Sequence, residues 1–303
     1  MRAIVVSLLF FGCVFGALGQ QPFKDPVFTS VNRMTMTYAD TLKADIYFAP
    51  QMRGGQKSPL LLLVHGGGFS SGKRDGDLES GFALAMAQRG YVVASISYDL
   101  VRKGQPEGFS CDCPATTKVE TFKHVAGNIY QAFDFLVNFS SEFNFDPEKI
   151  VLVGSSAGAE AVLHAAYARD HEAFSALEGQ GRKFAAVISF AGALIEGVEI
   201  KRANGVPALL VHGTDDKLVP YATAPHHYCE QGTPGYIVLQ GSGTIAEALQ
   251  EHGVPSTLIT AEGGGHEWAN KAYELTDDVS TFLYERLYEK KSGTQHKTID
   301  PQP

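Results

Sequence analysis

Residues 150–158 read Ile-Val-Leu-Val-Gly-Ser-Ser-Ala-Gly, and they are the most informative part of the chain about its fold. An apolar run at 150–153 leads into the pattern Gly154-x-Ser156-x-Gly158, and a helix-like segment follows at once. A serine at the centre of this pattern lies on a turn between strand and helix that is tight enough to require small neighbours. Such a turn lifts the hydroxyl above the sheet and directs the N-terminus of the helix toward any negative charge that forms there. The stretch therefore predicts a nucleophilic serine, and the alternative is a glycine- and serine-rich turn without catalytic role.

Strand-like and helix-like segments alternate on both sides of this motif. Two antiparallel strands are expected first. All expected strands lie at 30–38, 41–48, 60–64, 91–97, 150–153, 184–190, 206–211 and, last, 256–261, and the expected helices lie at 78–88, 119–143, 157–168, 244–252 and 275–288. This alternation is typical of a mostly parallel sheet with helices on both faces. We predict one α/β catalytic domain over residues 20–289 and a polar tail over 290–303, which we expect to be disordered.

A second glycine cluster, His65-Gly66-Gly67-Gly68-Phe69, follows the apolar run at 60–64. Successive glycines let backbone N–H groups point into a cavity without a side chain in the way. Such a loop suits hydrogen bonding to an oxyanion. A flexible glycine turn and a phosphate cradle are the alternatives, although a P-loop is excluded because no G-K-[ST] ends the motif.

Two later motifs supply candidates for the base and the carboxylate that a serine nucleophile needs. Residues 212–216, His-Gly-Thr-Asp-Asp, close the expected strand at 206–211, and residues 263–266, Gly-Gly-Gly-His, follow the expected strand at 256–261. Both motifs therefore fall at carboxyl ends of strands, at the same sheet edge as Ser156, where open α/β sheets build their sites.

On these motifs the chain resembles the α/β-hydrolase superfamily, whose triad follows the chain order Ser, Asp, His. Within it, residues 30–289 are similar to esterases of the hormone-sensitive-lipase type, which carry an H-G-G-G motif. The resemblance implies that Ser156 is the nucleophile, His266 the base and Asp216 the orienting carboxylate. Asp215, the neighbour of Asp216, is the alternative acid.

The resemblance also implies that the N–H groups of Gly67, Gly68 and Ala157 bind the oxyanion and that His65 holds this loop in place. It implies neither a metal ion nor an organic cofactor. Too few mature residues precede the first strand to form the helical cap of many such lipases. We therefore predict an α/β-hydrolase fold without a large cap domain, in which segments 103–117 and 221–243 could shape the pocket instead.

Residues 1–19 read as a secretory signal peptide. Arg2 is followed by an apolar run at 4–15 and by a small-x-small cleavage site at 17–19. The run is shorter than the roughly 20 residues that a membrane span needs. We predict a secreted or periplasmic protein without a transmembrane segment in the mature chain, and lipoprotein anchoring at Cys13 is the alternative.

The mature cysteines are Cys111, Cys113 and Cys229. In an oxidising compartment an odd count is explained by one disulfide and one spare thiol. Whether Cys111 or Cys113 pairs with Cys229 stays open. A metal site that includes His226 and His227 is an alternative, but the spacing matches no zinc pattern. We expect these two histidines at the surface rather than in the pocket.

The charge balance bears on possible partners. Lys and Arg number 25 against 33 Asp and Glu, a net charge of −8, and no run of Lys and Arg supplies the basic stripe that nucleic-acid binding requires. Residues 241–246, Gly-Ser-Gly-Thr-Ile-Ala, mimic a dinucleotide fingerprint, with Glu262 further along the chain. We favour a helix start without a ligand, because no repeated βαβ half surrounds the motif.

These features predict a serine hydrolase that cleaves carboxylic esters through an acyl-enzyme. Short-chain esters and acyl groups linked to carbohydrate are the expected substrates, so the expected partner is a small-molecule or polysaccharide-linked ester. A serine peptidase of the prolyl-oligopeptidase type is the first alternative, although 303 residues leave no room for its usual gating domain. A catalytically inactive hydrolase-fold binding protein is the second. The oligomeric state is not predicted.

Overall fold

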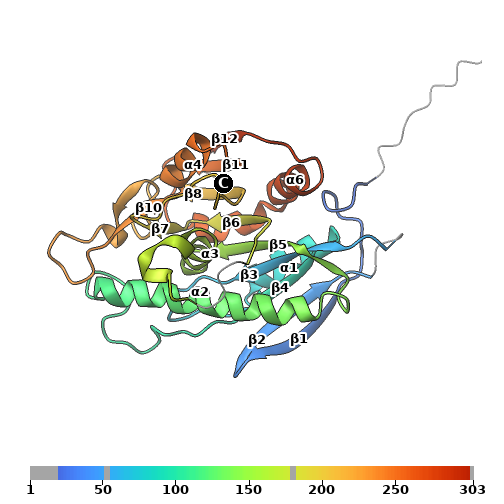
Figure 1. The fold of residues 1–303 in the computed structure, drawn as a ribbon, viewed down its shortest axis with the longest axis horizontal. Coiled ribbons are helices and arrows are strands. Elements are labelled where there is room, and N and C mark those ends of the chain that lie inside the picture. Colours follow the sequence, from blue (N-terminus) through green and yellow to red (C-terminus); the bar gives the residue numbers. More distant parts are fainter. Residues whose placement is uncertain (1–19, 51–54, 178–181, 301–303) are drawn as a thin grey trace, which may run out of the picture.

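A computed structural model describes residues 20–50, 55–177 and 182–300. The predicted signal peptide, residues 1–19, lies outside the described residues. In chain order the strands and helices are β1 Asn32–Ala39, β2 Leu42–Phe48, β3 Ser58–Val64, α1 Asp77–Gln88, β4 Val92–Ile96, α2 Ala115–Asn138, β5 Phe145–Ser155, α3 Ala157–Tyr167, β6 Ala186–Phe190, β7 Ala193–Ile195, β8 Ala208–Gly213, β9 Thr223–Pro225, β10 Val238–Gly241, α4 Ser242–Glu251, β11 Ser256–Ala261, α5 Trp268–Lys271, α6 Thr276–Leu287 and β12 Thr294–Ile299 (Figure 1).

A nine-stranded sheet in the order β1-β2-β4-β3-β5-β6-β8-β11-β12 runs through the molecule. Strand β2 is antiparallel to β1 and β4, and the pairs from β4 to β12 are parallel. The prediction of a mostly parallel sheet with an antiparallel hairpin at its start is therefore confirmed. Every residue of β3 is buried, as a continuous apolar run in a doubly covered sheet requires.

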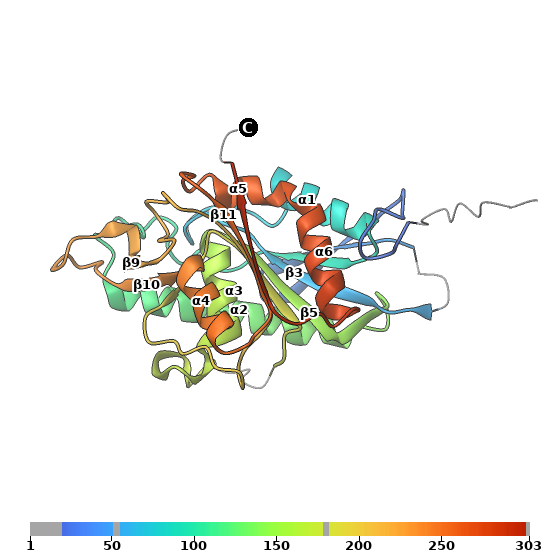
Figure 2. The ribbon, with the colours of Figure 1, turned by 90° about the horizontal axis from the view of Figure 1, so that it is seen from above.

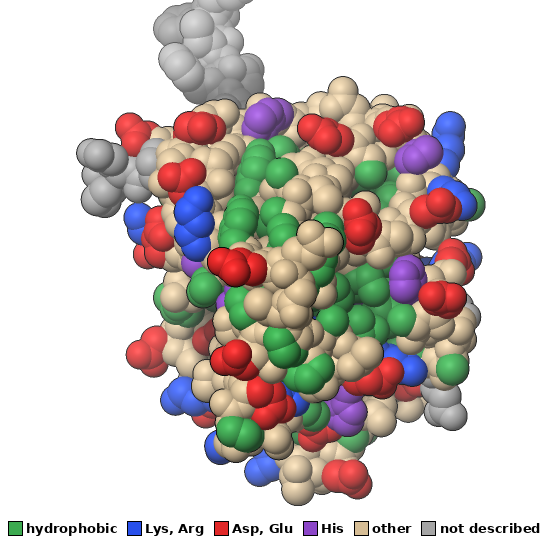
Figure 3. Space-filling view, turned by 90° about the vertical axis from the view of Figure 1, so that its left-hand side faces the viewer, with side chains coloured by type: hydrophobic (Ala, Val, Ile, Leu, Met, Phe, Trp, Pro, Cys, Tyr) green, Lys and Arg blue, Asp and Glu red, His purple; other side chains and the backbone are tan. Residues whose placement is uncertain are grey.

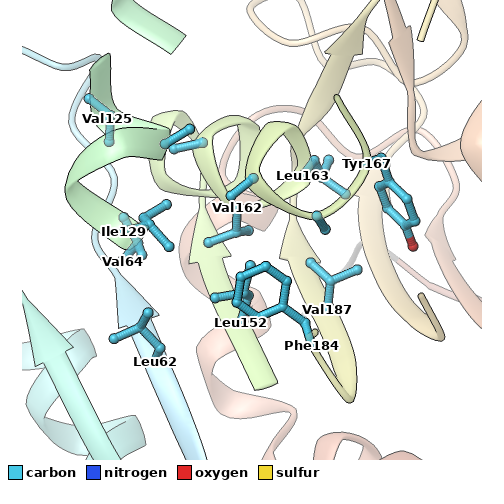
Figure 4. Packing of buried hydrophobic residues seen from close by; sticks show 14 of the residues in the cluster. Leu62, Val64, Val125, Ile129, Leu152, Val162, Leu163, Tyr167, Phe184 and Val187 are labelled. Atoms are coloured by element: carbon cyan, nitrogen blue, oxygen red, sulfur yellow. The ribbon is translucent and has the colours of Figure 1, made fainter. Parts of the chain in front are cut away.

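Helices cover both faces of this sheet. Figure 2 shows α1, α5 and α6 on one side and α2, α3 and α4 on the other. Helix α3 is buried along its whole length, because it lies between the sheet and α2. In the close view, Val162 of α3 lies above Leu152 and Val187 of the sheet and beside Ile129 of α2 (Figure 4). The nucleophile motif at the start of α3 is thus fixed by packing on two sides.

The expectation of a disordered tail is wrong for residues 294–299, which form β12. This strand pairs in parallel with β11, from Ser256 opposite Thr294 to Ala261 opposite Ile299. Five of its six side chains are exposed, so no apolar alternation marks it in the sequence. Backbone pairing with a neighbouring strand holds it, and β11 is consequently not the last strand.

Helix α2 is displaced from its predicted range of 119–143. It begins at Ala115, directly after Pro114, a residue that is tolerated where a helix starts. It ends at Asn138, and the Phe139 N–H closes the last turn on Leu136 O. Phe143 remains buried in the turn that follows, which explains why the apolar pattern continues past the end of the helix.

A second sheet, in the order β7-β10-β9, carries part of segment 221–243. A disulfide joins Cys229, in this segment, to Cys111, in the loop before α2. The prediction of one disulfide and one spare thiol is confirmed, because Cys113 is a buried free cysteine. None of the helices that the structure describes is long and apolar enough to cross a membrane.

Candidate active site

Ser156 lies on the turn between β5 and α3 and has a φ of +50° and a ψ of −123°. This left-handed conformation is uncommon for a residue with a side chain and often marks functional sites. A Cβ atom on Gly154 would lie 2.3 Å from Gly158 O, and one on Gly158 would lie 2.2 Å from Val64 O. Only glycine therefore fits on either side, and the turn directs the Ser156 side chain into a cavity.

Three side chains form a hydrogen-bonded chain at this turn. Ser156 Oγ lies 2.8 Å from His266 Nε2, and His266 Nδ1 lies 2.7 Å from Asp216 Oδ2. Ser156 follows β5, Asp216 follows β8 and His266 follows β11, so the carboxyl ends of three strands in one half of the sheet supply the group, with β6 between β5 and β8. The structure thus brings together the three residues that the motifs single out, with the imidazole between hydroxyl and carboxylate.

Asp216 is held in place as an anion. Its side chain is fully buried, and its Oδ1 accepts hydrogen bonds from the N–H groups of Leu218 and Val219 at 2.8 and 3.0 Å. Burial raises the pKa of Asp216, but hydrogen bonds from His212 and His266 outweigh it and hold the pKa well below its usual range. The neighbouring Asp215 is exposed. The structure therefore places Asp216, and not Asp215, against the His266 imidazole.

The glycine cluster after β3 lines the same cavity. Gly67, Gly68 and Ala157 all face it, and the two glycines have φ values of +114° and +59°. Among the described residues, the N–H groups of Gly68 and Ala157 have no hydrogen-bond acceptor. Two donors are thus available next to Ser156, which is the arrangement that stabilises a developing oxyanion.

His65 supports this loop and does not contact Ser156. Its Nδ1 lies 2.7 Å from Gly66 O, its ring stacks on Tyr98 at 4.3 Å, and the Tyr98 hydroxyl donates to His65 O. Burial lowers the pKa of His65, so its neutral ring donates to the loop carbonyl. The expected position of His65, as a residue that holds the glycine loop, agrees with these contacts.

The cavity above Ser156 has a volume of about 440 Å³. Phe109 from segment 103–117 and His226 and His227 from segment 221–243 form part of its wall. The expectation that these histidines lie at the surface is wrong, because His226 is 1% exposed and both face the cavity. The cause is a tertiary contact, because the Cys111–Cys229 disulfide joins segment 103–117 to segment 221–243. Segment 221–243 therefore folds over the site.

Glu160, which lies on α3 one turn after Ser156, belongs to none of the sequence motifs. It is 2% exposed and lines the cavity, although α3 is otherwise almost entirely apolar. A lone carboxylate in an apolar helix is the signal that could have identified it, since charged residues are rarely buried without a partner. Lys118 of α2 is also buried, and its Nζ donates to Gly235 O at 2.8 Å.

The dinucleotide-like pattern at 241–246 has a packing explanation. A Cβ atom on Gly241 would lie 1.8 Å from Pro220 O, and one on Gly243 would lie 2.8 Å from the Tyr221 ring. Both glycines are therefore needed for the start of α4 to approach the preceding segment. Over residues 20–50, 55–177 and 182–300, no cluster of His, Cys, Asp and Glu is arranged to hold a metal ion.

The surface charge is mixed. On the face shown in Figure 3, Lys and Arg side chains are interspersed with acidic ones, and hydrophobic side chains gather in patches between them. This agrees with the net charge of −8 and offers no continuous basic strip on that face.

Comparisons with known proteins agree with this architecture. The BD-FAE family model matches residues 44–199. Over 136 residues the chain is 34% identical to a fumonisin B1 esterase of Sphingopyxis macrogoltabida, which covers 43% of this chain. The match spans only 24% of that protein's length.

The solved structures that this chain resembles include esterase 2 of the planctomycete Thermogutta terrifontis. The TM-score is 0.57 at 21% identity, and the match covers 84% of this chain and 92% of that chain. The same esterase phosphorylated by paraoxon gives a TM-score of 0.57 at 21% identity, over 84% of this chain and 94% of that chain. This likeness confirms the predicted α/β-hydrolase fold.

Proposed function

The chain belongs to the BD-FAE family, within the hormone-sensitive-lipase-like group of α/β-hydrolases, and we propose that it hydrolyses carboxylic esters through an acyl-enzyme. The observation that carries the proposal is the hydrogen-bonded chain of Ser156, His266 and Asp216 beside free backbone donors in one cavity. The partial match to a fumonisin B1 esterase favours ester over amide cleavage.

In the proposed reaction His266 removes the proton from Ser156 Oγ, which attacks the ester carbonyl carbon. Asp216 keeps the imidazole in the correct orientation and stabilises the imidazolium that forms. The negative charge on the carbonyl oxygen lies against the N–H groups of Gly67, Gly68 and Ala157. His266 then protonates the leaving alcohol and activates the water that hydrolyses the acyl-enzyme.

The proposed substrates are short-chain esters or acyl groups linked to carbohydrate. A cavity of about 440 Å³ lies at the small end of the range for small-molecule sites, which favours a short acyl chain. The proposed compartment is extracellular or periplasmic, and the Cys111–Cys229 disulfide supports it because such bonds persist in oxidising environments. The proposed catalytic domain begins near residue 20 and includes β12.

The test is hydrolysis of p-nitrophenyl esters from acetate to palmitate, with a matching anilide to measure amide cleavage. We expect the rate to fall with chain length and the anilide to react more slowly than the ester. Ser156→Ala should lower kcat by at least about a thousandfold, because the nucleophile is lost.

Ser155→Ala is the matched control, since the buried Ser155 hydroxyl donates to Ala269 O and makes no hydrogen bond to Ser156, His266 or Asp216 among the described residues. It should retain most of the activity. Unchanged turnover in Ser156→Ala would refute the nucleophile. Faster anilide than ester cleavage would favour the peptidase, and a folded wild type without any turnover would favour the binding protein.

A further inference from the structure

Glu160 lies directly behind the nucleophile on a helix that is otherwise almost entirely apolar. Its N–H donates to Ser156 O at 2.9 Å, and residues spaced by four lie on one face of a helix. The side chain is 2% exposed and lines the cavity above Ser156. The Glu160 side chain therefore forms part of the wall of the space where the substrate must lie.

The carboxyl group lacks a complete set of partners. Glu160 Oε1 is buried and makes no hydrogen bond among the described residues, and His226 Nε2, 3.3 Å away, is its nearest ion-pair partner. His226 Nδ1 is likewise buried without a hydrogen bond. Buried polar atoms are almost always paired, so two unpaired atoms on adjacent side chains in one cavity indicate a site for a polar ligand.

His226 is held firmly at this position. Its N–H donates to Ile237 O at 2.8 Å, and the His227 N–H donates to Leu218 O at 2.9 Å. His227 and Tyr228 have φ values of +55° and +51°, and such conformations persist only where the surrounding structure imposes them. The disulfide at Cys229 ties the end of this segment to the loop that carries Phe109.

The protonation of the pair determines what it can bind. Burial raises the pKa of Glu160 well above its usual range, although Lys118 opposes this, and burial lowers the pKa of His226 well below its usual range. Both shifts favour the uncharged forms, in which each group has hydrogen-bond donor and acceptor capacity. A hydroxyl group, which both donates and accepts, matches them. A cation would be repelled by Lys118.

We propose that Glu160 and His226 form a specificity site that hydrogen-bonds a hydroxyl group of the ester substrate. Because Glu160 lies one helical turn from Ser156, about 5.4 Å along the axis, this hydroxyl lies a few bonds from the reacting carbonyl carbon. The proposal rests on the proposed esterase function and narrows its substrates to hydroxylated esters. A hydroxyl on the acyl part and one on the alcohol part have the same chemistry, so the test treats them separately.

Two matched pairs of esters, assayed at pH 7, separate these cases. For the acyl part, p-nitrophenyl 3-hydroxybutyrate is compared with p-nitrophenyl butyrate. For the alcohol part, 2,3-dihydroxypropyl acetate is compared with butyl acetate, and the released acetate is measured. We expect kcat/KM to be at least about tenfold higher for the hydroxylated member of one pair, since a site with buried polar groups disfavours a ligand that cannot pair them.

Glu160→Leu and Glu160→Gln form the variant pair. Leucine has no polar atoms, so it should lower kcat/KM for the hydroxylated ester at least about tenfold more than for the plain ester. Glutamine is neutral and keeps a donor and an acceptor, so it should keep the preference within about threefold. His226→Phe introduces a ring like those of the aromatic side chains around this position, and it should also lose the preference for the hydroxylated ester. It replaces Glu160→Leu in the test if that variant does not fold.

The proposal is overturned if wild type prefers neither hydroxylated ester, or if the leucine and phenylalanine variants lower both members of a pair equally. Loss of the preference in Glu160→Gln would also overturn it, because the binding carboxyl would then be ionised. Failure of the esterase assignment itself gives a different result, namely a folded wild type that hydrolyses no member of either pair.

Discussion

Asp215 and Asp216 are neighbours in the chain with opposite environments. Asp216 is buried and accepts hydrogen bonds from two backbone N–H groups and two histidines, whereas Asp215 is exposed. The chain therefore offers a pair of substitutions with the same chemistry at adjacent positions. Their comparison isolates the effect of the carboxylate that contacts His266.

We expect Asp216→Asn to lower kcat by about 10⁴-fold, because an amide favours the wrong tautomer of the imidazole and cannot stabilise the imidazolium. Asp215→Asn should change kcat by less than about threefold, since surface substitutions have small effects. The measurement is turnover of p-nitrophenyl acetate, with circular dichroism to verify folding. Equal losses in the two variants would contradict the assignment of Asp216.

The motif residues could be predicted individually because each lies in a short local pattern after a strand. The structure places Ser156, His266 and Asp216 in hydrogen-bond contact, as those patterns predict, and their catalytic roles remain predictions. Glu160 and His226 could not be predicted in this way. Their contact joins segments far apart in the chain, and neither segment carries a pattern that identifies the other.

Among the elements, the turn from β5 into α3 has a tight steric requirement next to the nucleophile. A Cβ atom on Gly158 would lie 2.2 Å from Val64 O and 2.6 Å from His65 O, so α3 can approach β3 closely only without a side chain here. Gly81, in α1, is a useful contrast. It is exposed, and a Cβ atom there would meet nothing within 4 Å.

We expect Gly158→Ala to lower the free energy of unfolding by about 1–3 kcal/mol, because the added methyl group overpacks the turn. It should also lower kcat, since α3 can relieve the clash only by moving Ser156 relative to His266. Gly81→Ala should instead stabilise the protein by about 0.5–1 kcal/mol, because alanine is the better helix former. Urea unfolding and ester turnover measure both effects, and a Gly158→Ala variant with wild-type stability would refute the steric argument.

Most elements of the fold could be predicted because their apolar side chains follow the periodicity of a helix or the run of a buried strand. The exceptions have physical causes. Strand β12 is exposed on nearly all its side chains, so backbone hydrogen bonds to β11 define it without an apolar pattern. Strands β7 and β9 have three residues each, too few for an alternation to be recognised. Helix α2 ends before its predicted C-terminal residue because Phe143 is buried outside any helix, so the apolar pattern continues past the helix.

For the molecule as a whole, the disulfide connects two walls of the cavity. Cys111 and Cys229 are 118 residues apart in sequence, and they join the loop that carries Phe109 to the segment that carries His226 and His227. A crosslink over a long loop stabilises mainly by restricting the unfolded chain, by roughly 4–5 kcal/mol on the chain-entropy estimate.

Reduction of this bond should therefore lower the melting temperature and reduce kcat/KM, because the two walls are no longer held together. Thermal unfolding and ester turnover with and without dithiothreitol test this, with thiol titration to verify reduction. A Cys111→Ser/Cys229→Ser double variant is the control, and dithiothreitol should not change it further. Full reduction of the wild type without any loss of stability would contradict the prediction.

The outermost strands of the sheet have a consequence for how the molecule behaves among its own copies. Both β1 and β12 expose most of their side chains, and both carry cationic residues, Arg33 paired with Asp45 and Lys297 paired with Asp278. Unpaired strand edges are where another chain can add by backbone hydrogen bonding, and charged side chains discourage such addition. Each edge strand of the sheet thus carries a charged side chain, a feature that disfavours edge-to-edge addition of another copy of the protein.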